Sequence, residues 1–419
     1  MPNAVFVLDH EQRPLRPVHP AVARRMLTMK QAAVFRRYPF TIICRGGIST
    51  GTAPPLRLKI DPGSKTTGLA ILDGHCVIWI AELTHRGSRI QAALEARRAI
   101  RRNRRQRHVR YRQPRFLNRT HPAGWLPPSL ESRVANVMIW VQRLARYARI
   151  AAISQELVRF DTQLMQSPEI TGVEYQHGEL AGYEVREYVL EKWHRTCAYC
   201  GVEGVRLEVE HIVPKIRGGS DRAGNLTLAC VPCNQKKGSQ TAAEFGYPLV
   251  QTQAKQPLKD AAAVNSTRWA LYHALQTTGL PVEVGTGGRT KYNRTRLGIP
   301  KSHWGDAACV GASTSDTLVL LTTHPLQITA MGRGTRQMCG TDKYGFPHRH
   351  RGRSTTFLGF ATGDIVTARI PTGKYTGVHT GRITIRQRAN FRLNGFDVRP
   401  KYLTIIAKKD GYAYGSHQH

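Results

Sequence analysis

Three short stretches in the first quarter of the chain have the hydrophobic patterns of β-strands. Apolar and polar residues alternate in Leu56–Ile60, Thr67–Leu72 is an apolar run, and Cys76–Leu83 is a third expected strand; the turn residues Asp61–Ser64 separate the first two. Alternation with a period of two is typical of a strand with one buried face, and two strands joined by a short turn are typical of a hairpin. The pattern predicts a three-stranded meander, preceded by a boundary in the Gly, Ser, Thr and Pro residues of 46–55.

Two helices with different surfaces are expected next. Residues 86–119 hold thirteen arginines and one acid, which predicts a helix charged nearly all round. From Ser129, a suitable N-cap, apolar residues recur at spacings of three and four as far as Ala148, which predicts an amphipathic helix. A buried strand over Ile150–Ile153, continued by Glu156–Val158, should follow.

The second half combines an inserted module with a β-rich end. Residues 180–248 hold four of the eight cysteines, and a helix over Asp260–Gln276, a strand over Val282–Val284 and a helix starting at Ala307–Ala312 are expected after them. Short alternating segments with glycine-rich turns between them then predict a small antiparallel barrel. These segments are Ile365–Ile370, Gly381–Ile385, Phe396–Val398 and Tyr402–Ile406.

The charge of the chain indicates its partners. Among 419 residues, 62 are Lys or Arg and 28 are Asp or Glu, which leaves a net charge of +34 and makes nucleic acid the first partner to consider. An acidic membrane is less favoured, because no stretch of about 18 apolar residues occurs. A hydrophobic content of 41% argues against a wholly disordered chain. Asp9, Glu11 and early prolines replace the apolar core of a secretory signal, so we expect a soluble cytoplasmic protein.

Four cysteines have the spacing of a structural zinc site. Each pair has the form CxxC, and two such pairs can close a tetrahedral site with four thiolates. The alternative is two redox-active or unrelated pairs, against which the second pair argues. The other four cysteines lack this spacing and are expected to be buried or free thiols. The zinc ligands are predicted to be Cys197, Cys200, Cys230 and Cys233.

The segment between the two cysteine pairs has the residues of a phosphodiester-cleaving site. Glu208–Pro214 contains His211 directly after Glu210, and Asn234 follows the last cysteine. His211 would activate water, while Glu210 and Asn234 would hold one divalent ion. With its Gly-Gly pair and Asn225, which we interpret as a loop brace, the segment resembles the HNH (ββα-metal) nuclease family. The alternative is a zinc ribbon that contains Glu-His by chance.

Three further acids and a histidine are scattered along the chain. Asp61 ends a strand, Glu156 lies in a second strand, and His303 precedes Asp306 by one helical turn. An isolated acid is usually solvated, but together these residues supply what a two-metal site for phosphoryl transfer needs. Their order resembles the split RuvC nuclease, which has an RNase H-like fold. That resemblance implies that the three acids bind Mg²⁺ and that His303 acts on the nucleophilic water.

The combination of these parts resembles one family in particular. A split RuvC with an arginine helix after its first segment and an HNH insert before its third is similar to IscB, a transposon-encoded RNA-guided nuclease related to the type II CRISPR effectors. Pro14–Leu27 and Tyr38–Thr41 resemble the PLMP domain of IscB, although Arg16 stands where Met is expected, and Glu156–Asp161 adds support. The resemblance covers nearly the whole chain and is weakest at the C-terminal end.

The resemblance implies an α/β multidomain protein. An RNase H-like mixed sheet would be split by the arginine-rich bridge helix and by a zinc-containing HNH insert, with a small C-terminal β-barrel-like domain. The expected division is 1–53, PLMP-like N-terminal domain; 54–84, RuvC segment I; 85–120, bridge helix; 121–179, RuvC segment II; 180–248, HNH domain; 249–328, RuvC segment III; and 329–419, a C-terminal domain that contacts RNA and the flanking DNA motif.

The resemblance also implies an activity. A guide RNA (ωRNA) would pair with one strand of double-stranded DNA and open an R-loop. The HNH domain would cut the guide-paired strand and RuvC the displaced strand by Mg²⁺-dependent hydrolysis, in a monomeric protein within a ribonucleoprotein. One alternative is an RNA-independent DNA-nicking nuclease of the homing type. Another is a non-cleaving nucleic-acid scaffold, against which both acidic sets and His211 argue.

The arginine-rich helix is the segment expected to bind nucleic acid. Its arginines occupy most directions around a helix, which suits contact with the backbones of guide RNA and RNA–DNA duplex, and a solvated charged arm is the alternative. Basic and aromatic residues near the C-terminus, such as Tyr375 and Phe391, are compatible with RNA contact and equally with a generic small barrel. The nucleic-acid-binding residues are predicted to be Arg97, Arg98, Arg101, Arg102, Arg104, Arg105, Arg107, Arg110 and Arg112.

Overall fold

The chain forms a mixed α/β structure of several parts, as expected. The computed structural model divides into two compact units: Met1–Pro55, Ile78–Ile150 and Leu321–His419 form unit 1, and Leu56–Val77 and Ala151–Leu320 form unit 2. The residues that the structure describes are 2–46, 53–106, 125–157, 189–190, 192–221, 223–255, 261–332, 339–343, 346–350, 356–386 and 390–416.

A mixed sheet forms the centre of unit 2. β4 and β5 form an antiparallel hairpin, and β10 runs parallel to β7. The residues of β5 from Thr67 to Leu72 are all buried, which agrees with the apolar run in the sequence. The strands follow one another in the order β10 (Val282–Gly285), β7 (Ile150–Glu156), β4 (Leu56–Asp61) and β5 (Thr66–Asp73), and the short β11 (Val319–Leu320) runs parallel to the first residues of β6 (Cys76–Thr84).

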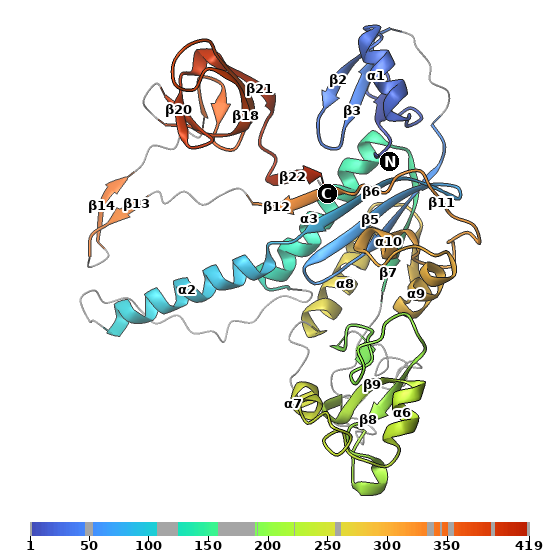
Figure 1. The fold of residues 1–419 in the computed structure, drawn as a ribbon. Coiled ribbons are helices and arrows are strands. Elements are labelled where there is room, and N and C mark those ends of the chain that lie inside the picture. The colour runs from blue at the N-terminus through green and yellow to red at the C-terminus, as the bar shows by residue number, and fades with distance from the viewer. Residues whose placement is uncertain are drawn as a thin grey trace. The chain divides into compact units, whose positions relative to one another are not determined.

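Three helices accompany this sheet, and the shortest lies across β4 and β5 (Figure 1). They are α8 (Ala261–Gln276), α9 (Gly287–Arg296) and α10 (His303–Ala308). Gly68 allows the close approach of α10, because a Cβ atom there would lie 1.8 Å from the carbonyl oxygen of His303. The expected helix start at Ala307–Ala312 is wrong. The Ser302 side chain accepts from the N–H of Gly305 at 3.1 Å and starts the helix earlier, and α10 ends before Cys309.

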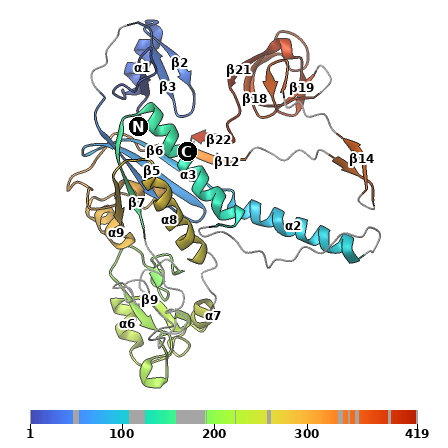
Figure 2. The same ribbon diagram turned by 180° about the vertical axis from the view of Figure 1, so that it is seen from behind.

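The inserted module of unit 2 is built on a β-hairpin. β8 and β9 pair in antiparallel fashion, and α6 and α7 pack on them (Figure 2). A core that includes Trp193 and Leu228 holds the module together. Its elements are β8 (Leu207–His211), the 3₁₀ turns η2 (Lys215–Arg217) and η3 (Ala223–Asn225), β9 (Leu226–Cys230), α6 (Val231–Lys237) and α7 (Leu249–Lys255).

The N-terminal part of unit 1 is a small three-stranded sheet with one helix. β1 runs parallel to β3, while β2 pairs with β3 in antiparallel fashion. Buried Val7, Met26 and Ile42 form its core. The elements are β1 (Phe6–Leu8), α1 (Pro20–Thr28), β2 (Ala32–Arg36) and β3 (Thr41–Cys44).

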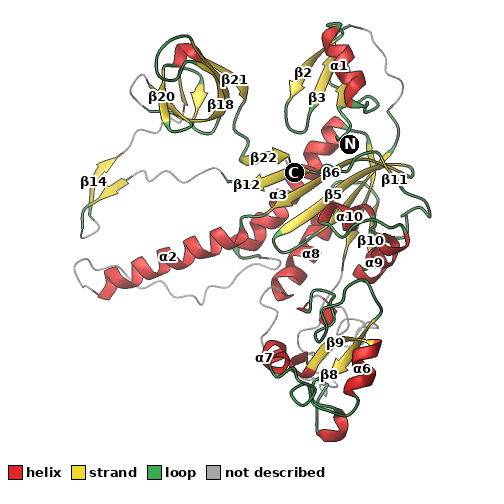
Figure 3. Cartoon of the chain, viewed as in Figure 1, coloured by secondary structure: helices red, strands yellow, loops and turns green. Residues whose placement is uncertain are grey.

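Two long helices of unit 1 follow β6 in the sequence. α2 (Gly87–Gln106) is one continuous helix (Figure 3), and residues 107–119 of the expected arginine helix lie outside the described residues. The amphipathic α3 (Pro128–Tyr147) buries Trp140, whose ring lies 6.5 Å from that of Trp79 in β6. The expected N-cap at Ser129 is wrong. Pro127 occupies that position, and a proline at the first helical residue suits the start of a helix.

The C-terminal part of unit 1 is rich in antiparallel strands. β12 (Leu326–Ala330) pairs with β6 and with β22 (Tyr412–Ser416). A five-stranded sheet then has the order β20–β19–β18–β17–β21, with Val366 and Phe391 in its core. Its strands are β17 (Ile365–Ile370), β18 (Gly377–Thr384), β19 (Phe391–Leu393), β20 (Phe396–Val398) and β21 (Leu403–Ala407), with the 3₁₀ turn η4 (Pro400–Tyr402) before β21. The short pairs β13 (Cys339–Thr341) with β14 (Pro347–His350) and β15 (Thr356–Phe357) with β16 (Phe360–Ala361) precede it.

Within the described part of the chain, no helix combines the length and the apolar character needed to span a membrane.

Candidate nuclease sites

His211 ends β8, and its imidazole contacts a carboxylate from the loop that follows. Nε2 of His211 lies 2.8 Å from Oδ1 of Asp221, and Oδ2 of Asp221 lies 2.8 Å from Nζ of Lys215. Hydrogen bonds from Lys215 and His211 lower the pKa of Asp221, so its ionised form is favoured. A carboxylate at Nε2 favours the tautomer in which Nδ1 carries the lone pair. Asp221 belongs to no short motif with His211, so the sequence did not reveal this contact.

Glu210 and Asn234 have different partners in the structure. The buried Glu210 carboxylate lies 2.5 Å from Nζ of the fully buried Lys237 and accepts a hydrogen bond from the hydroxyl of Tyr199 at 2.6 Å. Asn234 of α6 instead donates to Oε2 of Glu208 at 2.9 Å. Glu208 and Glu210 are two residues apart on β8 and therefore face the same side. Glu208 and Lys237 are not among the predicted site residues.

Asn225 braces the loop after His211, as expected. Its side chain accepts from the N–H of Val213 at 2.9 Å and donates to the carbonyls of Val213 and Ser220, each at 2.9 Å. Gly219 is needed beside it, because a Cβ atom there would lie 1.7 Å from the carbonyl oxygen of Val213. These contacts fix the loop that carries Asp221.

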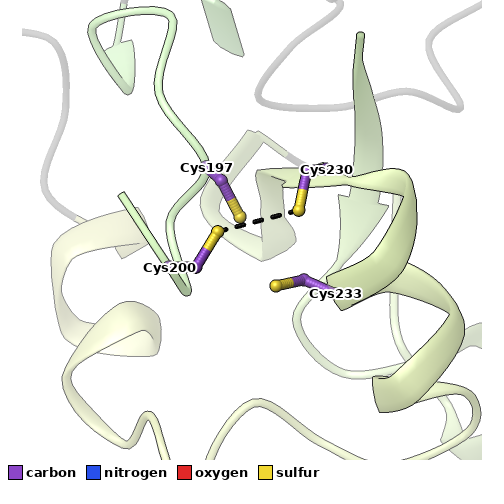
Figure 4. Close-up of side chains that lie close together, drawn as sticks. All are labelled: Cys197, Cys200, Cys230 and Cys233. Atoms are coloured by element: carbon purple, nitrogen blue, oxygen red, sulfur yellow. Dashed lines mark hydrogen bonds between the residues drawn. The ribbon is translucent and has the colours of Figure 1, made fainter. Parts of the chain in front are cut away.

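The four cysteines of the two CxxC pairs lie together (Figure 4), and their sulfur atoms are all within 4.8 Å of one another. Sγ of Cys200 lies 3.7 Å from Sγ of Cys230. A tetrahedral zinc with Zn–S bonds of about 2.3 Å separates its sulfurs by about 3.8 Å, so the arrangement fits a zinc site. Burial raises the pKa of Cys197, but backbone hydrogen bonds from its neighbours outweigh this and lower it to about 7. Burial and the neighbouring thiols raise the pKa of Cys233, so four thiolates would need a cation.

The residues predicted for a second site line one cavity in unit 2. Asp61 comes from the end of β4, Glu156 from the end of β7, and His303 and Asp306 from α10, and all four border a cavity of about 250 Å³. Asp61 and Glu156 are buried, and Asp306 is partly buried. Among the described residues, only the four cysteines bring three or more candidate ligand atoms within 4.8 Å of one another, so the carboxylates stand farther apart around the cavity.

Two arginines that no sequence motif predicts lie beside these carboxylates. Arg268 lies 3.3 Å from Oε1 of Glu156, and Arg294 lies 2.7 Å from Oδ1 of Asp306. Burial raises the pKa of Glu156 and of Asp306, while the arginines lower it in part. Burial disfavours the ionised form of a carboxylate, and a nearby positive charge favours it. Carboxylate oxygens are also ligands that suit Mg²⁺.

The predicted nucleic-acid-binding arginines of α2 are exposed, but they do not surround the helix. Residues 91–103 of α2 are all exposed, and so is Arg105. At about 100° per residue, the five predicted arginines whose side chains are described fall within an arc of about 140°, and only the exposed Arg89 of the first turn lies outside it. The expectation that they occupy most directions is therefore wrong, and they form one broad basic face. These five are Arg97, Arg98, Arg101, Arg102 and Arg105, while the side chain of Arg104 and residues Arg107, Arg110 and Arg112 lie outside the described residues.

The aromatic residues near the C-terminus divide into two groups. Tyr375 is 41% exposed and stacks on Phe396 with ring centroids 4.3 Å apart, and Nζ of Lys374 lies 5.7 Å from the centre of the Tyr375 ring. Phe391 is fully buried in the core of the five-stranded sheet. Tyr375 is thus available to a partner, whereas Phe391 has the core position that a small barrel would give it.

Two family models match the sequence of the chain. Residues 5–178 match the family described as RRXRR protein, and residues 197–240 match the HNH endonuclease family. The chain contains an RRXRR domain and an HNH endonuclease domain. The RRXRR region includes Arg101–Arg105, which read Arg-Arg-Asn-Arg-Arg. This combination is consistent with an IscB-like protein, so the resemblance is confirmed at this level, and the HNH domain supports a hydrolase that cleaves nucleic acid.

Parts of the chain also match solved structures of longer proteins. A crystal structure of Streptococcus thermophilus Cas9 in complex with the AGAA PAM is 13% identical, with a TM-score of 0.22 over 61% of this chain and 32% of that one. The Type II-C Cas9 enzyme from Actinomyces naeslundii is 17% identical, with a TM-score of 0.16 over 50% of this chain and 24% of that one. The matched regions thus span a third or less of those proteins. No curated protein matches the chain significantly.

Proposed function

We propose that the chain is an RNA-guided DNA endonuclease with two nuclease sites, each of which cuts one strand. The observation that carries the proposal is that Asp61, Glu156, His303 and Asp306, which are distant in the sequence, line one cavity in a chain that also contains an HNH endonuclease domain. A RuvC-type site needs carboxylates from separate segments in this way. The net charge of +34 and the exposed arginines of α2 support a nucleic-acid substrate.

In the HNH site, His211 accepts the proton of the attacking water. Asp221 holds the imidazole at Nε2 and stabilises the imidazolium that forms. Glu210 and Asn234 would hold one divalent cation, which would supply positive charge to the scissile phosphate. Lys237 is paired with Glu210, so the lysine and a cation would share this carboxylate.

In the RuvC site, Asp61, Glu156 and Asp306 would hold Mg²⁺, which would polarise the scissile phosphate. His303 stands at the start of α10, one turn before Asp306, and acts on the nucleophilic water. Arg268 and Arg294 offset the charge of two of the acids. The arginines thus offset part of the rise in pKa that burial causes, which favours the ionised form that binds a cation.

We assign the remaining parts to guide and target. The guide RNA (ωRNA) pairs with one DNA strand, the HNH domain cuts that strand, and RuvC cuts the displaced one. The basic face of α2 binds the phosphates of guide RNA and heteroduplex, and the four cysteines hold a structural zinc. This proposal includes the division of the chain into seven parts, in which residues 329–419 form a barrel-like domain that contacts RNA and the flanking DNA motif. So does a monomeric state within a transposon-encoded ribonucleoprotein.

The proposal is tested by the RNA that accompanies the protein. RNA that copurifies with the full chain should be a discrete species, and replacing its guide segment should redirect cleavage to a duplex that matches the new guide. Protein freed of RNA should not cut. Cleavage of a fixed DNA site after removal of the RNA would instead identify an RNA-independent nicking nuclease. Binding to duplex with neither strand cut, in Mg²⁺ and with the matching guide, would identify a scaffold.

A further inference from the structure

The helix α9 forms part of the wall of the RuvC cavity, the cavity that Asp61, Glu156 and Asp306 border. Its ten residues include four basic residues and no acid. Positive charge beside a site for phosphodiester cleavage attracts the backbone of a nucleic acid. A DNA strand that reaches the carboxylates can therefore lie along α9. The residues of α9 that line the cavity are Gly287, Thr290, Lys291 and Arg294.

Another face of α9 presents a large aromatic ring to solvent. Tyr292 is 64% exposed. Cζ of Arg296, one turn later in the helix, lies 5.8 Å from the centre of the Tyr292 ring, and Arg296 is itself paired with Asp316. At about 100° per residue, Tyr292, Arg296 and the exposed Arg289 fall within an arc of about 60°. This exposed face thus combines one aromatic ring with two guanidinium groups.

Small residues separate the exposed face of α9 from its cavity-lining face. Around the helix, Lys291 is the cavity-lining residue nearest to Tyr292, about 100° away. Of the residues of α9, only Gly288 and Thr295 fall between these two directions. The helix therefore places no large side chain between the ring and the cavity, and one strand can contact both.

The displaced DNA strand is the nucleic acid that fits this face best. It is single-stranded, and its sequence changes with every guide, so a residue that binds it has to accept any base. Stacking on an aromatic ring meets this requirement because every base has a π-face, and such rings act together with cationic groups that contact the backbone. The bases of the guide-paired strand are instead stacked within the heteroduplex.

We propose that Tyr292 stacks on an unpaired base of the displaced strand and so positions that strand for cleavage in the RuvC cavity. This inference rests on the proposed function of the cavity. Tyr292 is not among the residues that line the cavity, so the stacked base belongs to a nucleotide beside the cut and not to the scissile phosphate itself. The contact needs the ring and not the hydroxyl, and phenylalanine should therefore replace tyrosine.

The test compares variants of the guide-loaded full chain on a duplex with each strand labelled separately. Tyr292→Ala removes the ring, Tyr292→Phe keeps it, and Phe40→Ala is the matched control. Phe40 is an exposed aromatic residue of the N-terminal sheet of unit 1. A single abasic site is also placed at successive positions of the displaced strand near its cut. Asp61→Ala is run beside these variants, and thermal unfolding checks the fold of each.

Tyr292→Ala should slow cutting of the displaced strand about 5-fold to 150-fold, which is the factor expected for the loss of one stacked base, and leave the other cut at its normal rate. Tyr292→Phe and Phe40→Ala should cut both strands normally. In the normal protein, an abasic site at the stacked position should cause a loss of similar size. The same abasic site should cause little further loss in Tyr292→Ala, because both changes remove one contact.

Three results would overturn the inference: normal cutting of the displaced strand by Tyr292→Ala, an equal loss for both strands, or abasic effects that are the same in this variant as in the normal protein. Should Tyr292→Ala fail to fold, Tyr292→Leu is judged by the same criteria. If Asp61→Ala leaves both cuts intact, the proposed function fails as well, whereas a failure of Tyr292 alone leaves it standing.

Discussion

Replacing Arg101, Arg102 and Arg105 of α2 by glutamine should flatten the salt dependence of guide-RNA binding. The three side chains are exposed, and at about 100° per residue they point within an arc of about 100°, so one nucleic-acid backbone can contact all of them. Each phosphate contact contributes about 0.7 to the salt slope of log affinity for a single strand and about 0.9 for a duplex. Three contacts therefore contribute about 2.1 to 2.7, so over a tenfold rise in salt the normal protein should lose about 100-fold to 500-fold more affinity than the variant.

The assay measures binding of labelled ωRNA across a salt series for two unrelated guides. The matched control replaces Arg24, Arg25 and Lys30 by glutamine, because these exposed residues of the N-terminal sheet domain carry the same total charge. The slope should fall for both guides in the α2 variant and stay close to normal in the control. An unchanged slope, an equal fall in the control, or a loss confined to one guide would refute the assignment of α2 to backbone contact.

Three further changes test other parts of the structure. Cys230→Ser should lower bound zinc from about one equivalent per chain and unfold the module, as seen by elemental analysis and proteolysis, and a folded module without zinc would contradict this. Gly68→Ala should displace α10, because the new Cβ would lie 1.8 Å from a carbonyl oxygen of that helix. We expect the free energy of unfolding to fall by about 1–3 kcal/mol and the displaced strand to be cut more slowly. Normal values for both measurements would disprove this close contact. Burial lowers the pKa of Lys59 to about 8 from 10.5, so the unfolded chain binds more protons between these values and stability should rise with pH there. Between pH 8 and pH 10.5, Lys59 should contribute a rise of about 3 kcal/mol in the free energy of unfolding. Denaturant unfolding at these two pH values should show this rise in the normal protein and not in Lys59→Met.

Local patterns in the sequence predicted most of the strands. β4, β5 and β6 begin and end within a residue or so of the predicted strands, because short alternating or apolar stretches bounded by turn residues are typical of strands. The four zinc-binding cysteines were also predictable, because the CxxC spacing itself presents two sulfurs to one ion. Helix ends were harder. α10 starts at the cap that Ser302 provides, not at the apolar run that follows it.

Contacts between distant segments could not be read from the sequence. Asp221 reaches His211 only because Asn225 and Gly219 fold the intervening loop. Arg268 meets Glu156 because a helix far along the chain packs near β7, and no spacing records that contact. In contrast, the single basic face of α2 could have been predicted from helix geometry, because arginines three and four residues apart lie on the same side of a helix.

Strand-resolved cleavage of a guide-matched duplex tests the central claim most directly. With separate labels on the two strands, Asp61→Ala should leave only the cut in the guide-paired strand, and His211→Ala should leave only the cut in the displaced strand. Asp61 and His211 belong to separate sites, so each variant should still bind DNA and keep the other cut at its normal rate. Loss of both cuts in a folded, DNA-bound single variant, or no loss in either variant, would contradict the presence of two independent nuclease sites.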